Sequence, residues 1–201
     1  MSRIQTLAPA PPARQARSVE MRERLIAAAQ VILERGGLEA LNSNAVAAEA
    51  GASPPSFYRY FTDKYDLLAE LGRRLMNAQN TIIEQQAGGG FRSSEAAMES
   101  VLRETLAVTR AFRGGREIIS SLRASPDLAP VRLESHAHVA GLMAAEMAPG
   151  KRGKAKAEAY ARARMVVELG YAAIEMLLEV PDLDADTVLK ATARGLAHSL
   201  T

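Results

Sequence analysis

Apolar positions along this chain repeat every three or four residues, the spacing of one face of a helix. One such run predicts a helix from Ser18 to Arg35, ended by Gly36 and Gly37, and another predicts a long helix from Lys64 to Ala87. Sustained alternation of Val, Ile and Thr between turn residues, which indicates strands, is almost absent. The sequence therefore predicts an all-α fold with about nine helices.

Two short helices joined by a tight turn are predicted between residues 42 and 68. Ser43 is expected to cap the first helix, and Gly51 is expected to end it in a left-handed conformation. Ser53 is expected to cap the second helix. Pro54 suits the first helical position, because the N–H that proline lacks is not needed there.

The second short helix has one buried and one exposed side. Phe57 and Phe61 fall close together on an ideal helix and are expected to be buried. Arg59 lies at the centre of the opposite side, between Tyr58 and Tyr60. A guanidinium can fork onto guanine O6 and N7 in the DNA major groove, and phenol hydroxyls at its borders can reach phosphates. This pattern is typical of a DNA-recognition helix.

Flanking positions extend this interface. Ser43 and Asn44 begin the first short helix, where phosphate contact is compatible with capping. Lys64 begins the following helix, where its ammonium and the backbone amide groups attract phosphate. The predicted DNA-binding residues are Ser43, Asn44, Pro55, Ser56, Tyr58, Arg59, Tyr60 and Lys64.

The segment from Arg22 to Leu68 carries a specific combination of motifs, Ala50-Gly51-x-Ser53 followed by Tyr58-x-Tyr60-Phe61-x-x-Lys64. In these motifs the chain resembles the tetracycline-repressor-like (TetR/AcrR) family of bacterial regulators. It departs at Pro55, where the family usually has glycine, and this proline removes a backbone donor that could meet a phosphate. The resemblance implies a helix-turn-helix DNA-binding domain, a second domain that binds a small-molecule effector, and a dimer interface made from the last two helices.

The chain divides into three predicted segments. Residues 1–17 combine several prolines with three arginines and no acidic residue, so we expect a disordered arm. A tail exposed to solvent is the stronger interpretation of this arm, and a contact with DNA is the weaker one. Residues 18–77 are expected to form the helix-turn-helix domain, and residues 78–201 a helical ligand-binding and dimerisation domain. The helices expected in the last segment are Ser94–Phe112, Arg116–Arg123, Pro130–Met147, Ala157–Val180 and Asp184–Leu200, with a basic loop at Pro149–Lys156.

The helix predicted at Ala157–Val180 is apolar over most of its circumference. Arg164, Glu168, Glu175 and Glu179 form one narrow polar stripe along it. A helix of this kind needs more cover than one small domain readily provides. Together with the last helix it is expected to pack against its own copy, and a two-fold dimer reads a palindromic operator.

Composition narrows the choice of function. The 201 residues carry a formal charge of +2 and no cysteine, which excludes disulfides and thiolate metal sites. The positive excess lies in residues 1–75, with ten basic against eight acidic side chains. No apolar run reaches the roughly 18 residues that span a bilayer, so a cytoplasmic protein without membrane contact is expected.

Evidence for an enzyme is poor. Common hydrolase, metalloprotease and phosphate-loop motifs do not occur, and His136 and His138 are two residues apart, so a helix directs them to different sides. We therefore predict no catalytic residues, no metal site and no cofactor. Phe112, Met143 and Tyr171 are candidate pocket residues, although ordinary core packing is the stronger interpretation for each.

The predicted function is a homodimeric transcriptional regulator, most simply a repressor that a small-molecule effector releases from palindromic double-stranded DNA. Two alternatives stay open. One is a DNA-binding protein without a ligand, which acts in chromosome organisation or division. The absence of a cavity of a few hundred cubic ångströms in the second domain would favour this alternative. The other is a helical protein-binding adaptor that no longer reads DNA.

Overall fold

Nine α-helices make up the part of the chain that the computed structural model describes, residues 13–87 and 94–200. No strand occurs in these residues, which confirms the predicted all-α fold. None of the described helices is long and apolar enough to span a membrane. The helices are α1 (Ala13–Ala40), α2 (Ser43–Glu49), α3 (Pro54–Tyr58), α4 (Lys64–Ala87), α5 (Glu95–Ala111), α6 (Gly115–Ala124), α7 (Ala129–Met147), α8 (Gly153–Glu179) and α9 (Ala185–Leu200).

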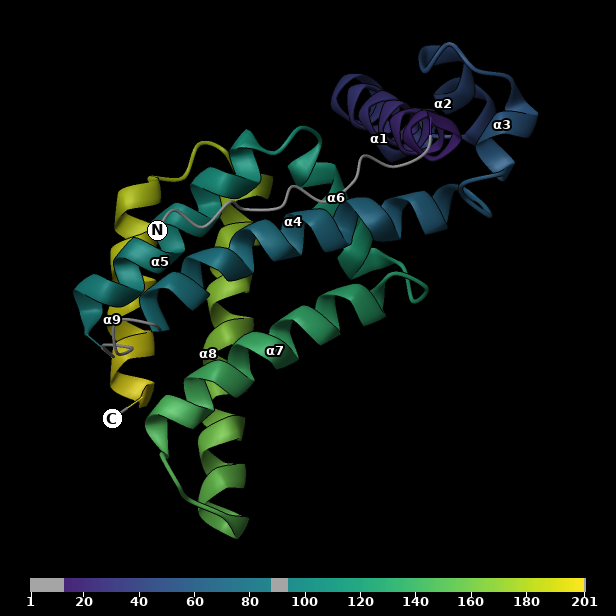
Figure 1. Ribbon diagram of the computed structural model, residues 1–201. Helices are drawn as coiled ribbons and strands as arrows, with labels where there is room; N and C mark the ends of the chain where they lie inside the picture. The colour runs from purple at the N-terminus through teal and green to yellow at the C-terminus, as the bar shows by residue number, and fades with distance from the viewer. Residues whose placement is uncertain (1–12, 88–93, 201) are drawn as a thin grey trace, which may run out of the picture.

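Helix α4 connects the two halves of the molecule (Figure 1). Its beginning follows α3 and packs against α1, and its later turns pack against α5 and α7. Helices α5, α8 and α9 also pack together, and α7 crosses α8. Since α4 runs without a break past residues 77 and 78, the predicted domain boundary, a tilt of α4 moves α3 relative to the second half.

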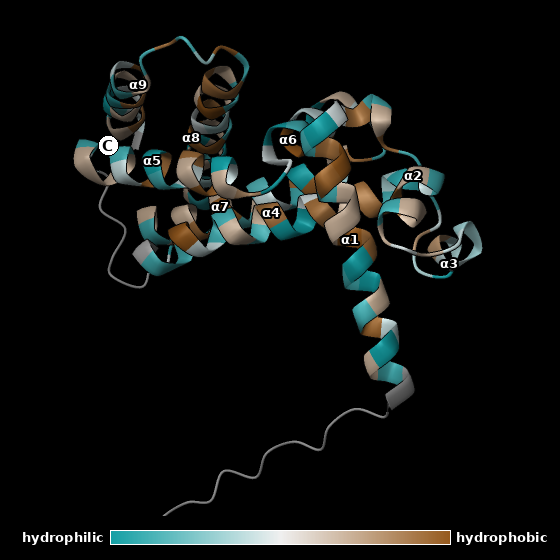
Figure 2. Ribbon diagram, turned by 90° about the horizontal axis from the view of Figure 1, so that it is seen from above, coloured by the Kyte–Doolittle hydropathy of each residue, from teal (hydrophilic) through white to brown (hydrophobic). Residues whose placement is uncertain are grey.

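Helix α1 is longer than the sequence predicted. It begins at Ala13 instead of Ser18 and ends at Ala40 instead of Arg35, with one break at Gly37, where φ is 65° and ψ is −165°. Residues 13–17, predicted to be disordered, are therefore helical, because the prolines end at Pro12 and the residues that follow favour helix. The remainder of the predicted arm lies outside the described residues. The first turns of α1 project from the body (Figure 2), and residues 15–20 are all exposed.

Helix α8 also begins earlier than predicted. It starts at Gly153, so Lys154 and Lys156 lie in its first turns and not in a loop. The connection turns through Gly150 and Gly153, whose φ angles are 69° and 59°, and the Lys, Ala and Glu residues that follow favour helix. The predicted basic loop is therefore confined to residues 149–152. The predicted ends of α5 agree closely with the structure, since Ser94 is its N-cap and Phe112 its C-cap.

Candidate nucleic-acid interface and ligand cavity

Helix α3 has only five residues and is held from behind by two aromatic rings. Phe57 is fully buried and Phe61 nearly so, as predicted. Their ring centroids lie 5.8 Å apart, and the Arg22 guanidinium lies 5.3 Å from the Phe61 centroid. A helix this short is not stable alone in water, so these contacts fix its position. The exposed face of α3 is therefore held in a fixed position.

The capping of the two short helices differs from the prediction. Asn42, not Ser43, caps α2, because its side-chain oxygen accepts a hydrogen bond from the Ala45 N–H at 2.9 Å. The Ser43 hydroxyl lies 2.8 Å from the Tyr58 hydroxyl and ties α2 to α3. Ser53 is the N-cap residue of α3 but makes no capping bond with its side chain. The predicted left-handed turn is confirmed at Gly51, whose φ is 63°.

The predicted DNA-binding residues differ in their exposure. Asn44, Pro55, Tyr58 and Arg59 are exposed, whereas the other four are partly buried. Arg59 is the C-cap residue of α3, and no hydrogen bond or ion pair joins its guanidinium to another described residue. The partly buried four are Ser43, Ser56, Tyr60 and Lys64. Whether these eight side chains meet DNA stays a prediction.

The start of α4 is less open to phosphate than the sequence suggested. The Asp63 carboxylate accepts hydrogen bonds from the N–H groups of Tyr65 at 2.8 Å and Asp66 at 2.9 Å. The Asp66 carboxylate in turn accepts the N–H of Thr62 at 3.0 Å. The Asp63 carboxylate thus occupies two of the amide groups that were expected to attract phosphate, those of Tyr65 and Asp66. Lys64, whose ammonium lies 5.4 Å from the Tyr65 ring centroid, is the remaining cation at this end of α4.

Arg24 supports the turn between α2 and α3, a role that the sequence did not indicate. Its guanidinium donates a hydrogen bond to the Ala50 carbonyl, the C-cap residue of α2. A cation at this place satisfies a free carbonyl and matches the negative end of the helix dipole. No local motif marks this contact, because the partners are 26 residues apart.

A network of charged side chains joins α1 to α4. Arg74 donates to Glu70 at 2.8 Å and to both carboxylate oxygens of Glu23 at 2.6 Å, and Arg22 also binds Glu70. Burial opposes ionisation of Glu70, but the hydrogen bonds from the two arginines outweigh it and lower the pKa of Glu70 to about 2. The folded state therefore holds this carboxylate ionised well into the acidic range.

The second half touches the N-terminal half through the connection between α5 and α6. The Arg113 side chain donates to the Glu34 carboxylate at 2.7 Å, and the Gln30 side chain donates to the Arg113 carbonyl at 3.2 Å. Gly114, with a φ of 72°, follows directly and lies against Leu33. The N-terminal half is therefore attached to the second half through α4, through this connection and through α6, which packs against α1.

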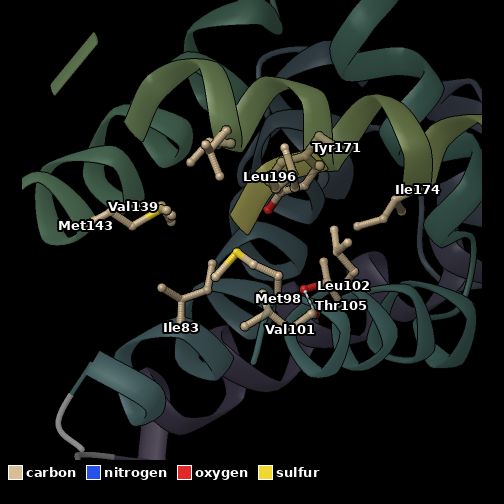
Figure 3. Close-up of a pocket in the computed structure, with 13 residues that line it drawn as sticks. Ile83, Met98, Val101, Leu102, Thr105, Val139, Met143, Tyr171, Ile174 and Leu196 are labelled. Atoms are coloured by element: carbon tan, nitrogen blue, oxygen red, sulfur yellow. Dashed lines mark hydrogen bonds between the residues drawn. The ribbon is translucent and has the colours of Figure 1, made fainter. Parts of the chain in front are cut away.

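An apolar cavity of about 50 Å³ lies between α4, α5, α7, α8 and α9 (Figure 3). Met143 and Tyr171, two of the predicted pocket residues, line it. Phe112 does not line it, because it is the C-cap residue of α5 and lies in the connection towards α6. The three predicted residues therefore do not form one site.

Buried polar side chains form a chain behind this cavity. The Tyr171 hydroxyl donates to the Gln79 side-chain oxygen at 3.0 Å, and the Gln79 amide donates to the Thr109 hydroxyl at 2.7 Å. His136 stacks on Tyr171 with centroids 4.2 Å apart and binds the Glu168 carboxylate at 3.0 Å. Burial lowers the pKa of His136, although Glu168 opposes this, so the imidazole is neutral at pH 7.

Comparison with known sequences matches part of the N-terminal half to a protein family. Residues 25–71 match the family model described as "Bacterial regulatory proteins, tetR family". The HTH-type transcriptional repressor DrrR1 of Streptomyces coeruleorubidus is 38% identical over 88 residues, or 44% of this chain. The matched region spans 31% of the length of that relative.

Solved structures share the fold over most of the chain. A member of the TetR family from Streptomyces coelicolor A3 has a TM-score of 0.66 and 22% identity, and the match covers 87% of this chain and 97% of that one. The multidrug binding protein EbrR, crystallised with imidazole, has a TM-score of 0.67 and 22% identity, with 87% and 89% covered. At this identity the likeness establishes the arrangement of helices alone.

Proposed function

We propose that this chain, whose residues 25–71 match the TetR family of bacterial regulatory proteins, is a homodimeric repressor which a small-molecule effector releases from a palindromic operator. The observation that carries the proposal is the exposed Arg59 guanidinium, which has no partner among the described residues, on a helix that two buried aromatic rings hold in place. An unpaired cation held rigidly at a protein surface suits bidentate contact with guanine.

Contacts around Arg59 fit the same proposal. The Tyr58 side chain is 57% exposed, and its bond to Ser43 fixes the direction of its hydroxyl. Asn44 is exposed at the start of α2, where it can reach a phosphate while Asn42 does the capping. Phosphate contacts of this kind set the position of the protein on the duplex, and the Arg59 contact reads a base.

The outer face of α8 supports a second copy of this chain as the dimer partner. Met165, Leu169, Ala172 and Met176 are exposed along it at spacings of four, three and four residues. This is the heptad spacing of helices that pack on one another. The three large side chains are 40–49% exposed, which is unusual for a monomer.

The polar stripe of α8 does not interrupt this apolar face. Glu168 binds Arg164 at 2.7 Å within α8 and His136 on α7, and Glu175 binds Arg123 on α6 at 2.8 Å. These carboxylates therefore point sideways, towards α7 and α6. Helix α9 lies beside α8 (Figure 1) and exposes the small residues Ala191 and Gly195, which permit close approach.

A ligand in the cavity would bear on α4 directly. Ile83 of α4 and Tyr171 of α8 both line the cavity, and Gln79 of α4 holds the Tyr171 hydroxyl. Expansion of the cavity would push these helices apart and tilt α4, which begins directly after α3. The effect on operator affinity can be no larger than the difference in ligand affinity between the two arrangements.

One observation favours a ligand-free DNA-binding protein as the second candidate. The cavity of about 50 Å³ is far smaller than the few hundred cubic ångströms of ordinary small-molecule sites. Effector release therefore requires the cavity to enlarge. Under the second candidate no small molecule binds there and operator affinity depends on DNA alone.

Selection of bound fragments from random DNA tests the proposal. We expect the purified protein to enrich a palindrome with half-sites about one helical turn apart or a multiple of it. Enrichment of a DNA sequence without two-fold symmetry would reject recognition of DNA by a symmetric dimer. Failure to retain any fragment at moderate salt would reject DNA binding and favour a protein-binding adaptor.

A further inference from the structure

The two ends of helix α8 carry opposite charge. Residues 151–162, at its beginning, hold five basic side chains and one acidic one. Residues 175–186, at its end and in the connection to α9, hold five acidic side chains and no basic one. These segments lie at opposite ends of a helix that is about 40 Å long (Figure 1). One end of α8 is therefore strongly positive and the other strongly negative.

This distribution of charge opposes the dipole of α8. The beginning of a helix is the positive end of its dipole and favours carboxylates, whereas the end of a helix favours cations. The first turn of α8 holds no acidic residue, and its last turn holds no basic one. The stability of α8 itself therefore does not explain why its charges are arranged in this way.

Most of these charged side chains are exposed and unpaired. At the basic end, the one ion pair that the described residues form joins Lys154 to Glu158 at 3.8 Å. At the acidic end, Glu179 and Asp182 are exposed and form no ion pair with another described residue. These groups are therefore available to a second molecule. The exposed cations that have no ion pair in the described part of the chain are Lys151, Arg152, Lys156 and Arg162.

The apolar face of α8 fixes how two copies of this helix can pair. Its four residues are symmetrical in sequence about one midpoint, and they are Met165, Leu169, Ala172 and Met176. A two-fold axis perpendicular to α8 at this midpoint makes the two copies antiparallel. Leu169 then faces the partner's Ala172, and Met165 faces the partner's Met176. An axis parallel to α8 would instead bring ends of like charge together, so the charges favour the antiparallel pair.

The heptad spacing of this face continues by three residues at either end, to Arg162 and Glu179. In antiparallel copies it places the Arg162 guanidinium beside the partner's Glu179 carboxylate. This contact occurs twice in the dimer, about 13 Å from the axis on either side. Farther from the axis, the basic residues 151–156 reach the acidic residues 182–186 of the other copy. Each copy thereby neutralises both ends of the other copy's α8.

We propose that two copies of this chain pair α8 with α8 in antiparallel directions, and that residues 151–162 of each copy bind residues 179–186 of the other. The inference rests on the proposed function, which names a second copy as the partner but neither its direction nor its charged contacts. These contacts make the association specific, because an apolar helix without this charge pattern would leave both ends of α8 unpaired.

Two charge reversals test the contact between Arg162 and Glu179. In Arg162→Glu two carboxylates face each other at both symmetric places, and in Glu179→Arg two guanidinium groups do. We expect each variant to raise the dimer dissociation constant about tenfold in sedimentation at low salt. An equal mixture of the two variants restores opposite charges at both places, so heterodimers should exceed their random share of one half in native mass spectrometry. A variant that merely misfolds would not recover in the mixture.

Arg110→Glu and Glu104→Arg are the matched controls, because both side chains are exposed on α5 and lie outside the proposed contact. They should leave the dissociation constant unchanged and mix at random. Unchanged dissociation in both test variants, or random mixing of the two, would overturn the antiparallel contact while the dimer stands. A wild-type chain that stays monomeric would instead reject the dimer of the proposed function.

A combined variant tests the basic end of α8, with Lys151→Gln, Lys154→Gln and Lys156→Gln in one chain. We expect the dimer dissociation constant to rise about threefold to tenfold and to depend less on salt, since salt screens exposed charge pairs. If the dissociation constant and its salt dependence stay unchanged while DNA binding weakens, these lysines contact DNA. That result would overturn their place in the dimer.

Discussion

Replacement of Phe57 by Ala should unfold the recognition segment while the second half stays folded. Phe57 is 0% exposed and lies in a five-residue helix that has few other anchors. A Phe-to-Ala change at a fully buried site costs about 3–5 kcal/mol. Since whole domains are stable by about 5–15 kcal/mol, this loss removes a large part of the free energy of unfolding of the N-terminal half.

Hydrogen exchange read by mass spectrometry measures this effect segment by segment. In Phe57→Ala the amides of residues 43–61 should exchange at least about a hundredfold faster, the equivalent of roughly 3 kcal/mol, while those of α8 keep their protection. Operator affinity should fall with the folded fraction of α3. Tyr65→Ala is the matched control, because Tyr65 is an aromatic residue of the same half that is 38% exposed, and it should change exchange little.

Two results would refute this reasoning. Unchanged exchange in residues 43–61 would mean that the Phe57 ring does not hold α3. Loss of protection in α8 to the same degree would mean that the two halves unfold as one unit, and the segment could not be perturbed alone.

Three further changes test other parts of the structure. Leu169→Glu places a charge at the centre of the apolar face of α8, so it should convert the proposed dimer to monomers in sedimentation. Glu104→Gln, at an exposed position, should not. Folding lowers the pKa of Glu70 from 4.5 to about 2. The contribution of Glu70 to the free energy of unfolding is therefore complete above pH 4.5 and is lost as the pH falls towards 2. In Glu70→Gln the free energy of unfolding, measured by denaturant titration, should fall less between pH 4.5 and pH 2, by about 1–2 kcal/mol after allowance for solvent screening. An unchanged dependence of the unfolding free energy on pH would exclude this network as the cause of the acid decline. Gly115→Ala would place a carbon 2.2 Å from the Thr109 carbonyl oxygen and should lower the melting temperature by several degrees, which Gly141→Ala should not do.

Features that depend on neighbouring residues in the sequence were predictable. Apolar spacing gave the helices, because burial of one helix face requires that spacing wherever the helix packs. The turn at Gly51 and the proline at the start of α3 followed from backbone conformation alone. The burial of Phe57 and Phe61 followed from their separation of four residues.

Features that depend on residues far apart in the chain were not predictable. Arg24 binds Ala50, and Ser43 binds Tyr58, through contacts that only the folded chain creates. Helical spacing shows that a residue is buried but not in which part of the core, so Phe112 could not be separated from Met143 and Tyr171. The five extra residues at the start of α1 were missed because nearby prolines suggested disorder for the whole segment.

The most direct test of a base-reading α3 compares Arg59→Ala with Lys64→Ala on the selected operator and on its single-base variants. We predict that Arg59→Ala loses about 1–3 kcal/mol of discrimination at one symmetric pair of positions, while Lys64→Ala weakens binding to all sequences alike. An unchanged base preference in Arg59→Ala, at any overall affinity, would contradict the assignment of α3 as the helix that reads DNA.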